Sequence, residues 1–400
     1  MKAVILVAGE GRRMHPLTNT RPKAMLPVAN KPILEHLLVE FSKAGINEFI
    51  FVTGYRDDKV RGYFGDGKQW GVEIIYLKQQ QQLGTANAIG IVEEMVGANF
   101  LVANSDLIIS AQDVIRLAEN RKNTMCVVEV KNSRGLGVVE LANDRILCIL
   151  EKMEKPPSNK ANAGLYLFTP DIFKAIARTT KSPRGEYEIT DSLQLLIAGG
   201  EEVFYEEIEG WRDLSYPWDL LSANEAVLAY MEPQNAGEVE SNVVLKGCVS
   251  IGKNTVIKSG SYIIGPVVIG QDCEIGPNCY IRPSTSIGDH CHIGFAVEVK
   301  NSIIMNGSKL PHHNYVGDSI IGEYCNLGAG AKIANLRLDR KEISFGGINT
   351  GRFKLGTIMG DRVQVGINAS INTGTMIGNN SFIGPGAIAA GVILPDSKIH

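Results

Sequence analysis

The sequence predicts a two-domain protein in which an α/β domain with a mostly parallel sheet precedes a parallel β-helix. Three observations support this prediction. The first half of the chain alternates strand-like apolar runs with helical periods, which is typical of α/β folds. From residue 243 onward, apolar residues recur every six positions, as expected for a β-helix with one short strand per face of a triangular coil. A polar segment with proline and glycine separates the two patterns, so we place the domains at 1–231 and 243–400 and the linker at 232–242.

The composition excludes several classes of protein. With 400 residues, of which 44% are hydrophobic and 21% charged, the chain is an ordinary globular protein with room for two domains. The net charge of −3 and the absence of a long basic run argue against a nucleic-acid partner. No apolar stretch has membrane-span length or a signal-peptide pattern, so we expect a cytoplasmic protein without a membrane partner. Seven cysteines, an odd number without Cys-x-x-Cys, argue against structural zinc and a disulfide framework.

The first predicted strand leads into a loop suited to a polyphosphate. Residues 3–7 form an uncharged aliphatic run, which is typical of a buried parallel strand. The loop that follows carries Gly9 and Gly11, and successive amides in such a loop can surround an anion. Arg13 and Lys23 follow, and these cations suit a triphosphate whose charge grows as pyrophosphate leaves. The alternative is a strand–turn–helix whose basic turn is only solvated, because Gly-x-Gly alone is weak evidence.

The longer string GEGRRMHPLT at residues 9–18, followed by RPK at 21–23, resembles the signature of sugar-1-phosphate nucleotidylyltransferases. The resemblance implies a Rossmann-like nucleotidyltransferase domain in which Arg13 is the catalytic arginine and Lys23 binds the phosphates. Arg12 stands where the family usually has Thr or Ser, and we assign it no role. The resemblance also implies nucleotide contacts at the end of the first strand and in its loop, at Leu6, Ala8, Gly9 and Gly11.

Further elements follow in the same alternation, with strands at 48–52, 71–76 and 98–103 and helices at 33–44, 85–95 and 219–231. Ligands of open α/β sheets lie at the C-terminal ends of strands, where the Gly9 loop and Asp106 both fall. Four glutamines follow the strand at 71–76, and a glutamine amide can recognise a base edge with one donor and one acceptor. The segment resembles the family loop that recognises a pyrimidine. By that resemblance the nucleotide contacts are Gln79, or Gln82 as a second candidate, together with Gly84 and Thr85.

Two aspartates are candidates for binding a metal. Asp106 ends the strand at 98–103, where a lone aspartate is more often a cap or turn residue. Asp213 lies in the string WRDLSYPW at 211–218, which resembles the family's W-x-D-[IV]-G-x-P-W. The resemblance implies that both carboxylates bind Mg²⁺, although Ser105 and Ser215 replace family glycines. Two carboxylates plus phosphate oxygens and waters suit the octahedral shell of Mg²⁺.

The sugar-1-phosphate would contact segments that resemble the family's G-V, E-K-P and N-A-G-[IL]-Y motifs. Each taken alone could be a solvated loop, but all occur in the family's order along the first 220 residues or so. Met153 and Glu154 interrupt the second motif, so Lys152 and Lys155 could exchange roles. The implied sugar-phosphate contacts are Gly137, Glu151, Lys152, Asn162 and Thr190.

The six-residue repeat of the second domain predicts an inward-facing apolar ladder. A small residue stands four positions after most ladder residues, and that position should also face inward. Four of the seven cysteines occupy such positions, so we interpret them as core fillers: Cys273, Cys279, Cys291 and Cys325. The pattern resembles the left-handed β-helix of hexapeptide-repeat acyltransferases. That resemblance, and not the spacing, implies left-handedness and a homotrimer with active sites between subunits.

Two segments break the period, 301–320 and 334–358, and breaks in a solenoid are expected to mark functional loops. The first contains HHNYVGD at 312–318, and a loop histidine can act as a general base near neutral pH. An ordinary surface histidine is the alternative. The string resembles H-x-x-Y-[LV]-G-D of the acetyltransferase half of bifunctional N-acetylglucosamine-1-phosphate uridylyltransferases. The resemblance implies that His312 is the catalytic base and that Asn335 helps to hold that base and the thioester.

The same resemblance assigns an acetyl-acceptor site to Arg282, Lys300, Tyr315 and Asn326. Leu336 stands where the related enzymes have Tyr, and the 334–358 loop is longer than theirs. The loop is basic and could either hold coenzyme A phosphates or be solvated; its cations are Arg337, Arg340, Lys341, Arg352 and Lys354.

Together the two halves predict a bifunctional enzyme. We expect acetyl transfer from acetyl-CoA to glucosamine-1-phosphate, galactosamine-1-phosphate or both. We then expect transfer of a nucleotidyl group from UTP, or dTTP, to the product with Mg²⁺, releasing pyrophosphate. One alternative is a nucleotidylyltransferase with that single activity and a structural β-helix. Another is a non-catalytic assembly subunit of the same architecture.

Overall fold

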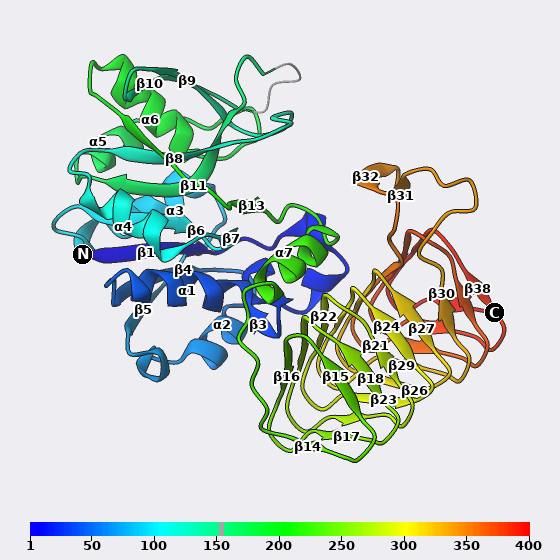
Figure 1. Cartoon of the computed structure of the whole chain (residues 1–400). Helices are drawn as coiled ribbons and strands as arrows, with labels where there is room; N and C mark the ends of the chain where they lie inside the picture. Colours follow the sequence, from blue (N-terminus) through cyan, green and yellow to red (C-terminus); the bar gives the residue numbers. More distant parts are fainter. Residues whose placement is uncertain (152–155) are drawn as a thin grey trace. The chain divides into compact units, whose positions relative to one another are not determined.

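The computed structural model describes residues 1–151 and 156–400, apart from the side chain of Asp213, as two compact units (Figure 1). The first unit comprises 1–10, 21–25 and 33–213, and the second comprises 11–20, 26–32 and 214–400. The helix predicted at 219–231 is present as α7 (Asp219–Leu228), and both α7 and the predicted linker belong to the second unit. Among the described residues, no helix combines the length and hydropathy that crossing a membrane requires.

A nine-stranded sheet forms the first unit, in the order β5-β4-β1-β6-β11-β8-β12-β10-β9. Its strands are β1 (Lys2–Val7), β4 (Glu48–Thr53), β5 (Glu73–Lys78), β6 (Phe100–Asn104), β8 (Thr124–Glu129), β9 (Val138–Ala142), β10 (Arg145–Leu150), β11 (Lys160–Phe168) and β12 (Phe204–Glu207). Strands β5, β4, β1 and β6 are parallel, whereas β11 runs antiparallel to β6 and β8. The prediction of a mostly parallel sheet is therefore wrong beyond β6, where β12 is parallel to β8 but the other neighbouring strands are antiparallel. The residues that the structure describes between β8 and β11 form no helix, and parallel neighbours need such a crossover whereas antiparallel ones do not.

Helices cover both faces of this sheet because its strands alternate their apolar side chains. In β1, Ala3, Ile5 and Val7 face one apolar core and Val4 faces the other. The first core packs α1 (Ile33–Lys43), α2 (Asp57–Phe64) and α4 (Ala111–Glu119). The second packs α3 (Thr85–Gly90), α5 (Ile172–Ile176) and α6 (Ile189–Ala198). Helix α3 ends before the predicted boundary at 95, and a short 3₁₀ turn (Glu93–Met95) follows it.

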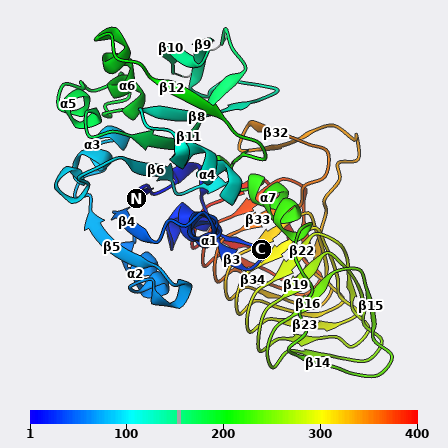
Figure 2. The same ribbon diagram turned by 60° about the vertical axis from the view of Figure 1, so that its left-hand side comes forward.

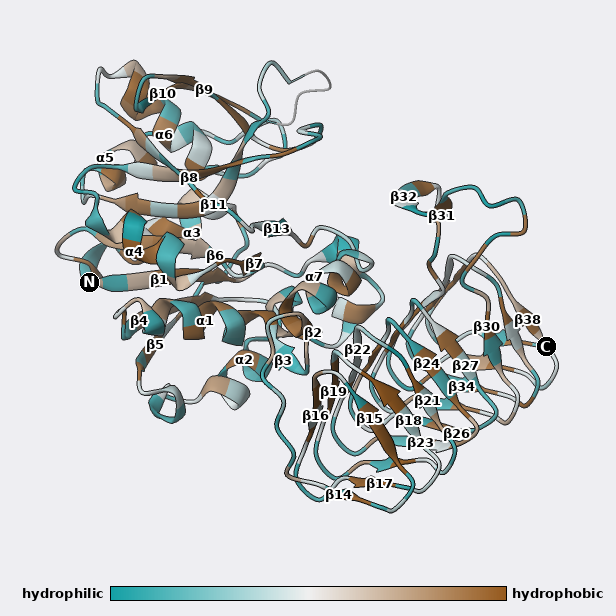
Figure 3. Cartoon of the chain, viewed as in Figure 1, coloured by the Kyte–Doolittle hydropathy of each residue, from teal (hydrophilic) through white to brown (hydrophobic). Residues whose placement is uncertain are grey.

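Three parallel sheets form the β-helix of the second unit, and apolar residues mark its strands in Figure 3. The first sheet contains β14 (Glu238–Val239), β17 (Val256–Ile257), β20 (Glu274–Ile275), β23 (His292–Phe295), β26 (Lys309–His312), β29 (Asn326–Leu327), β34 (Gln364–Val365), β37 (Phe382–Ile383) and β40 (Lys398–Ile399). The second contains β15 (Val244–Lys246), β18 (Tyr262–Ile264), β21 (Tyr280–Ile281), β24 (Glu298–Lys300), β27 (Tyr315–Gly317), β30 (Lys332–Ile333), β35 (Ser370–Ile371) and β38 (Ile388–Ala389). The third contains β16 (Val249–Ile251), β19 (Val267–Ile269), β22 (Thr285–Ile287), β25 (Ile303–Ile304), β28 (Ile320–Ile321), β33 (Thr357–Met359), β36 (Thr375–Ile377) and β39 (Val392–Ile393).

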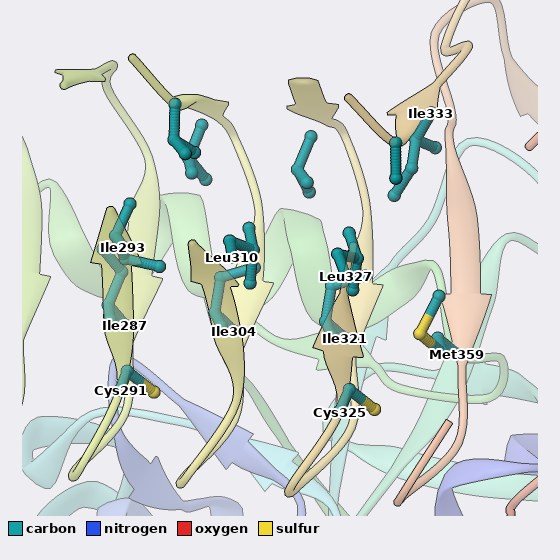
Figure 4. Close-up of a cluster of buried hydrophobic side chains, with 14 of the residues drawn as sticks. Ile287, Cys291, Ile293, Ile304, Leu310, Ile321, Cys325, Leu327, Ile333 and Met359 are labelled. Atoms are coloured by element: carbon teal, nitrogen blue, oxygen red, sulfur yellow. The ribbon is translucent and has the colours of Figure 1, made fainter. Parts of the chain in front are cut away.

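The predicted apolar ladder fills the interior of the coils (Figure 4). Ile287, Ile304 and Ile321 occupy equivalent places in successive coils. The four cysteines predicted as core fillers are all buried, which confirms that interpretation. Burial raises the pKa of the Cys279 thiol to about 11 and that of Cys325 to about 12. A thiol with so high a pKa is a poor nucleophile near neutral pH.

One corner of the β-helix accounts for both breaks in the repeat. Strands β25 to β28 run through residues 301–320, so the prediction of a loop there is wrong. Instead, the corner between the second and third sheets is one residue shorter in two successive coils. Ladder residues on either side of it are five positions apart rather than six, as in Val299 and Ile304 and again in Val316 and Ile321. In the next coil the same corner carries the 334–358 insertion. It contains the hairpin β31 (Ile343–Phe345) and β32 (Ile348–Arg352), which extends from the coils in Figures 1 and 2.

Candidate active sites

In the first unit, Lys23 and Asp106 form an ion pair at the C-terminal edge of the parallel strands. Lys23 begins a 3₁₀ turn (Lys23–Met25), and Asp106 lies between β6 and β7 (Leu107–Ile108). The Lys23 ammonium donates to the Asp106 carboxylate, and their side chains are 14% and 30% exposed. The structure therefore brings together two of the predicted residues, and it leaves both of them partly accessible to a ligand.

Backbone pairing brings Asp213 to the same place. Strand β13 (Arg212–Asp213) runs antiparallel to β7, with Asp213 opposite Leu107. Asp106 and Asp213, which are far apart in the sequence, thus lie on adjoining backbone segments. Carboxylate oxygens are the ligands that Mg²⁺ takes from proteins when substrate phosphates and waters complete its shell. The residues at this position therefore fit the predicted metal.

The signature loop that carries Arg13 belongs to the second unit. Gly11 has φ 72°, a conformation that favours glycine, and its carbonyl accepts hydrogen bonds from Met14 N (2.8 Å) and Thr18 Oγ1 (3.0 Å). Arg13 follows in a 3₁₀ turn (Arg12–Met14), with its guanidinium 5.6 Å from the centroid of the Tyr216 ring. This geometry matches a cation–π contact.

The β-helix coils hold the far end of the signature loop. Thr20 Oγ1 donates to Asp361 Oδ2 at 2.6 Å, and Asn19 Nδ2 lies 2.8 Å from Asn379 Oδ1. Nothing in the local sequence of this loop indicates these partners, which lie more than 300 residues away. A segment of the nucleotidyltransferase signature is thus built into the β-helix unit.

The two candidate glutamines have different surroundings. Gln79 is buried, and its Nε2 donates to Asn87 Oδ1 (2.7 Å) and Gly84 O (3.2 Å). Among the described residues no donor reaches Gln79 Oε1, so its acceptor is available to a base. Gln82 Nε2 instead donates to Ala8 O at 2.8 Å and supports the glycine loop. These contacts favour Gln79 for base recognition.

The other predicted nucleotide contacts differ in their surroundings. Leu6 lies near the end of β1, and a side chain added at Gly9 would meet no atom within 4 Å. At Gly84, φ is 110° and an added Cβ would lie 2.5 Å from the Tyr187 carbonyl oxygen, so only glycine fits. Thr85 Oγ1 accepts a hydrogen bond from Ile189 N at 2.9 Å, which makes Thr85 a structural link to α6.

The predicted sugar contacts include an acidic cluster that sequence reasoning identified only in part. A Cβ added at Gly137 would lie 2.9 Å from Glu151 Oε1. Arg184 Nη2 lies 3.7 Å from Glu151 Oε2 and 2.7 Å from Glu188 Oε1. Burial, and next the charge of Glu151, raise the pKa of Asp191. Arg184 and Asp191 were missed as site residues, although Asp191 directly follows the predicted contact Thr190.

Asn162 and Thr190 present polar atoms nearby. Asn162 Nδ2 donates to the Tyr166 hydroxyl at 2.8 Å, and its Oδ1 accepts from Gly164 N at 2.9 Å. The buried hydroxyl of Thr190 has no hydrogen-bond partner among the described residues. Such an orphaned hydroxyl is costly unless a ligand satisfies it, which is consistent with a sugar contact. Lys152 and its alternative Lys155 lie outside the described residues.

In the β-helix, Asp318 is the centre of a cluster that gathers several predicted residues. Its carboxylate is 3% exposed and accepts hydrogen bonds from three side chains. These are Lys300 Nζ (2.9 Å to Oδ2), Asn301 Nδ2 (2.8 Å to Oδ1) and Asn335 Nδ2 (2.5 Å to Oδ2). Sequence reasoning missed Asp318, although it ends the matched HHNYVGD string. Successive coils stack their corners, and this stacking alone brings Lys300, Asp318 and Asn335 together.

Arg282 and Tyr315 lie beside this cluster on the same sheet. Arg282 Nη1 donates to Glu298 Oε1 at 2.9 Å, which leaves most of its guanidinium donors for a ligand. Glu298 in β24 pairs in register with Tyr315 in β27. Burial, and next the charges of Glu298 and Asp318, raise the pKa of the Tyr315 phenol. A Cβ added at Gly317 would lie 2.7 Å from both the Tyr315 hydroxyl and Asn335 Nδ2, so glycine makes their approach possible.

The predicted base, His312, lies at one end of strand β27 and Asp318 lies at the other end. His312 ends β26, three residues before Tyr315, whereas Asp318 directly follows β27. His312 is exposed, and its backbone N donates weakly to Asn314 Oδ1 at 3.4 Å. The side-chain amide of Asn335 bonds Asp318 instead. Asn326 lies on the first sheet, opposite Lys309. Within one chain, therefore, His312 and the Asp318 cluster are at different corners.

The cations of the 334–358 insertion do not form a uniform basic surface. Arg337 pairs with Asp339 inside the insertion (2.7 Å). Arg352 in β32 donates to Ser222 Oγ on α7, and burial lowers its pKa. A solvated cation is therefore the wrong prediction for Arg352, whereas a coenzyme A contact of the insertion stays a prediction. Leu336 forms an isolated backbone bridge with Lys354 at the base of the insertion.

The sequence matches two family models, one described as nucleotidyl transferase over residues 2–229 and one described as GMPPB C-terminal domain over residues 263–375. It is 39% identical to a bifunctional protein GlmU of Methanococcus maripaludis, covering 100% of this chain and 97% of that protein. It is 41% identical to a bifunctional sugar-1-phosphate nucleotidylyltransferase/acetyltransferase of Sulfurisphaera tokodaii, covering 97% of each. The structure of a UDP-glucose pyrophosphorylase complexed with UDP-glucose aligns with TM-score 0.52 and 26% identity over 57% of this chain and 99% of that one.

Proposed function

This chain belongs to the family of bifunctional sugar-1-phosphate nucleotidylyltransferases/acetyltransferases, and we propose that it makes UDP-N-acetylhexosamine in two steps. The first step acetylates glucosamine-1-phosphate, galactosamine-1-phosphate or both, with acetyl-CoA as the donor. The second transfers the uridylyl group of UTP to the product and releases pyrophosphate, and dTTP as the donor would give the dTDP sugar instead. The observation that carries this proposal is that each unit brings predicted residues together: Lys23 and Asp106 with the backbone of Asp213 in one, and Lys300 and Asn335 around Asp318 in the other.

In acetyl transfer, the amine nitrogen of the sugar attacks the thioester carbonyl. A carbon–nitrogen bond forms, the carbon–sulfur bond breaks, and His312 accepts the proton that the amine loses. The departing coenzyme A thiolate is then protonated to the thiol. Arg282 and Lys300 hold the sugar phosphate, since guanidinium and ammonium groups bind phosphate oxygens strongly. Asp318 keeps the Lys300 and Asn335 side chains in place.

In nucleotidyl transfer, a phosphate oxygen of the sugar-1-phosphate attacks the α-phosphorus of the nucleotide, and the bond to the β-phosphate breaks. Catalysis of this kind is mostly positioning and charge neutralisation, so no nucleophilic side chain is needed. Arg13 and Lys23 neutralise the phosphates, and Gln79 recognises the base. Asp106 and Asp213 would hold Mg²⁺, which neutralises charge on the departing pyrophosphate. In the first unit, Lys23 is already oriented by Asp106.

We also propose a homotrimer with a cytoplasmic location. The support is the separation of His312 from the Asp318 cluster within one chain. An acetyl site that uses both would be completed by a neighbouring copy.

The experiment that tests the acetyl step is free-thiol release from acetyl-CoA with glucosamine-1-phosphate and, separately, galactosamine-1-phosphate. We expect release to depend on the amino sugar and to fall by about 100-fold or more in His312→Ala, as is usual when a general base is lost. The matched control is His313→Ala, because His313 packs its ring against Phe295 with centroids 5.2 Å apart. No thiol release with either sugar, in protein that still releases pyrophosphate, would leave a single-activity nucleotidylyltransferase.

A further inference from the structure

The 334–358 insertion buries the ring of Phe345 and exposes the side chains of Ile348 and Phe353. Phe345 at the end of β31 is 1% exposed, whereas Ile348 and Phe353 are 45% and 55% exposed. The Phe345 ring stacks on Trp218, with centroids 5.5 Å apart and planes 14° apart. The insertion is therefore docked on the segment before α7 through a specific contact.

The stack continues beyond Trp218 toward the signature loop. Trp218 stacks on Tyr216 with centroids 4.7 Å apart and planes 6° apart. The Arg13 guanidinium lies 5.6 Å from the centroid of the Tyr216 ring. We call this series, Phe345, Trp218, Tyr216 and Arg13, the aromatic column. All four residues belong to the second unit.

Hydrogen bonds fix the column at two further points. Arg352, at the other end of the hairpin, donates to Ser222 on α7. The backbone N of Tyr216 donates to Asp219 Oδ2 at 2.7 Å, which ties the ring to the first turn of the same helix. The hairpin therefore contacts α7 and the residues before it from both of its strands.

Tyr216 is positioned to orient the Arg13 side chain. Within the described part of the chain, the Arg13 guanidinium contacts the Tyr216 ring and forms no hydrogen bond or ion pair. A free arginine side chain loses rotamer entropy when it is fixed, and a side chain that is already held loses less. A guanidinium that stacks on a ring keeps the N–H donors at its edge available for phosphate oxygens.

We propose that Phe345 is a positioning residue for nucleotidyl transfer and that the insertion of the β-helix holds Arg13 in place through the aromatic column. This inference rests on the proposed catalytic role of Arg13. It assigns the long insertion a task at the nucleotidyl site, in place of coenzyme A binding. It also means that the β-helix contributes to both reactions.

The test measures pyrophosphate release and thiol release in the full-length enzyme for Arg13→Ala, Phe345→Ala, Phe345→Tyr and Phe353→Ala. Phe345→Ala is expected to lower kcat of pyrophosphate release by about tenfold or more with little change in KM for UTP, because a small displacement of a catalytic group can cost about 100-fold. Thiol release should be unchanged. Phe345→Tyr, which keeps the ring, should retain most of the rate, and Phe353→Ala, which alters an exposed ring of the same insertion, should behave as wild type.

A double variant distinguishes positioning from general destabilisation. If Phe345 acts through Tyr216, adding Phe345→Ala to Tyr216→Leu should lower kcat little further, because coupled residues are not additive. Equal losses of pyrophosphate release and thiol release in Phe345→Ala would show a structural role only and overturn the inference.

Two other outcomes separate this inference from the proposed function. If Phe345→Ala kept the wild-type kcat of pyrophosphate release while Arg13→Ala lost most of it, the proposed role of the aromatic column would be refuted. The proposed role of Arg13 would stand. Undiminished pyrophosphate release in Arg13→Ala would refute the proposed role of Arg13, and the inference with it.

Discussion

Asn335 donates a hydrogen bond from Nδ2 to the Asp318 carboxylate at 2.5 Å across two successive coils, although 17 residues separate them in the chain. The same carboxylate binds Lys300 from the coil before. A buried carboxylate is tolerated only when its charge and lone pairs are satisfied, and here an ammonium and two amides satisfy them. The corner is therefore a preorganised polar site rather than a solvated turn.

The first prediction concerns Asp318→Asn. Loss of the charge leaves the partly buried Lys300 ammonium without its partner, and breaking a fully buried ion pair costs about 3–5 kcal/mol, which is an upper bound here because the Lys300 side chain is 20% exposed. We expect a lower unfolding temperature for the β-helix in calorimetry and a fall of about 100-fold in thiol release as the site loses its geometry. Pyrophosphate release should be retained. Asp339→Asn is the matched control, because its pair with Arg337 is exposed, and it should change neither activity. Unchanged thiol release in Asp318→Asn would contradict the assignment.

The second prediction concerns Asp106→Asn. An amide is a weaker ligand for Mg²⁺ than a carboxylate and does not pair with the Lys23 ammonium. We expect pyrophosphate release to fall by about 100-fold at saturating substrates, as is usual when charge stabilisation is lost. A Mg²⁺ titration should also shift to higher concentration. The exposed Asp171, which pairs with Lys174 on the surface, is the control position. If the Mg²⁺ titration of Asp106→Asn matched that of the wild type, Asp106 would not be a ligand of the metal.

The third prediction uses the pH dependence of stability. Burial and Glu151 raise the pKa of Asp191 in the folded protein, so the folded state binds its proton more tightly than the unfolded state does. The free energy of unfolding should therefore fall as the pH rises from the pKa of Asp191 in the unfolded chain to its pKa in the folded protein. At neutral pH, where Asp191 is ionised in both states, this loss of stability should be complete. Asp191→Asn removes the titrating group. Its urea midpoint should match wild type below pH 3.5 or so and exceed it at pH 7. A difference between the two proteins that does not change with pH would show that the charge is not responsible.

The fourth prediction tests whether neighbouring copies share the acetyl site. His312→Ala and Asp318→Asn should each release little thiol alone. If the site uses His312 from one subunit and the Asp318 cluster from another, unfolding and refolding the two variants together should restore part of the activity. Each variant, unfolded and refolded by itself, provides the control. Failure of the mixture to exceed either variant, with mixed trimers confirmed by mass spectrometry, would show that each site lies within one chain.

Several features of the fold could be predicted because their signals are local or periodic. The six-residue repeat required one inward apolar residue per face, and Ile287, Ile304 and Ile321 lie where it placed them. Asp106 directly follows an apolar run, so it was expected at the end of a parallel strand, where ligands of such sheets bind. Its ion pair with Lys23 lies at that place.

The sequence by itself determined the α/β class of the first half, the ladder of the β-helix and the positions of the signature residues along the chain. Only the tertiary structure decided the partners of those residues. The contacts of Asp318 depend on how corners of successive coils stack, and Phe345 meets Trp218 from more than 100 residues away. Likewise, the mixed half of the sheet follows from strand pairing after Asn104. Contacts of this kind leave no period in the sequence, because they are set by the packing of distant segments rather than by neighbouring residues.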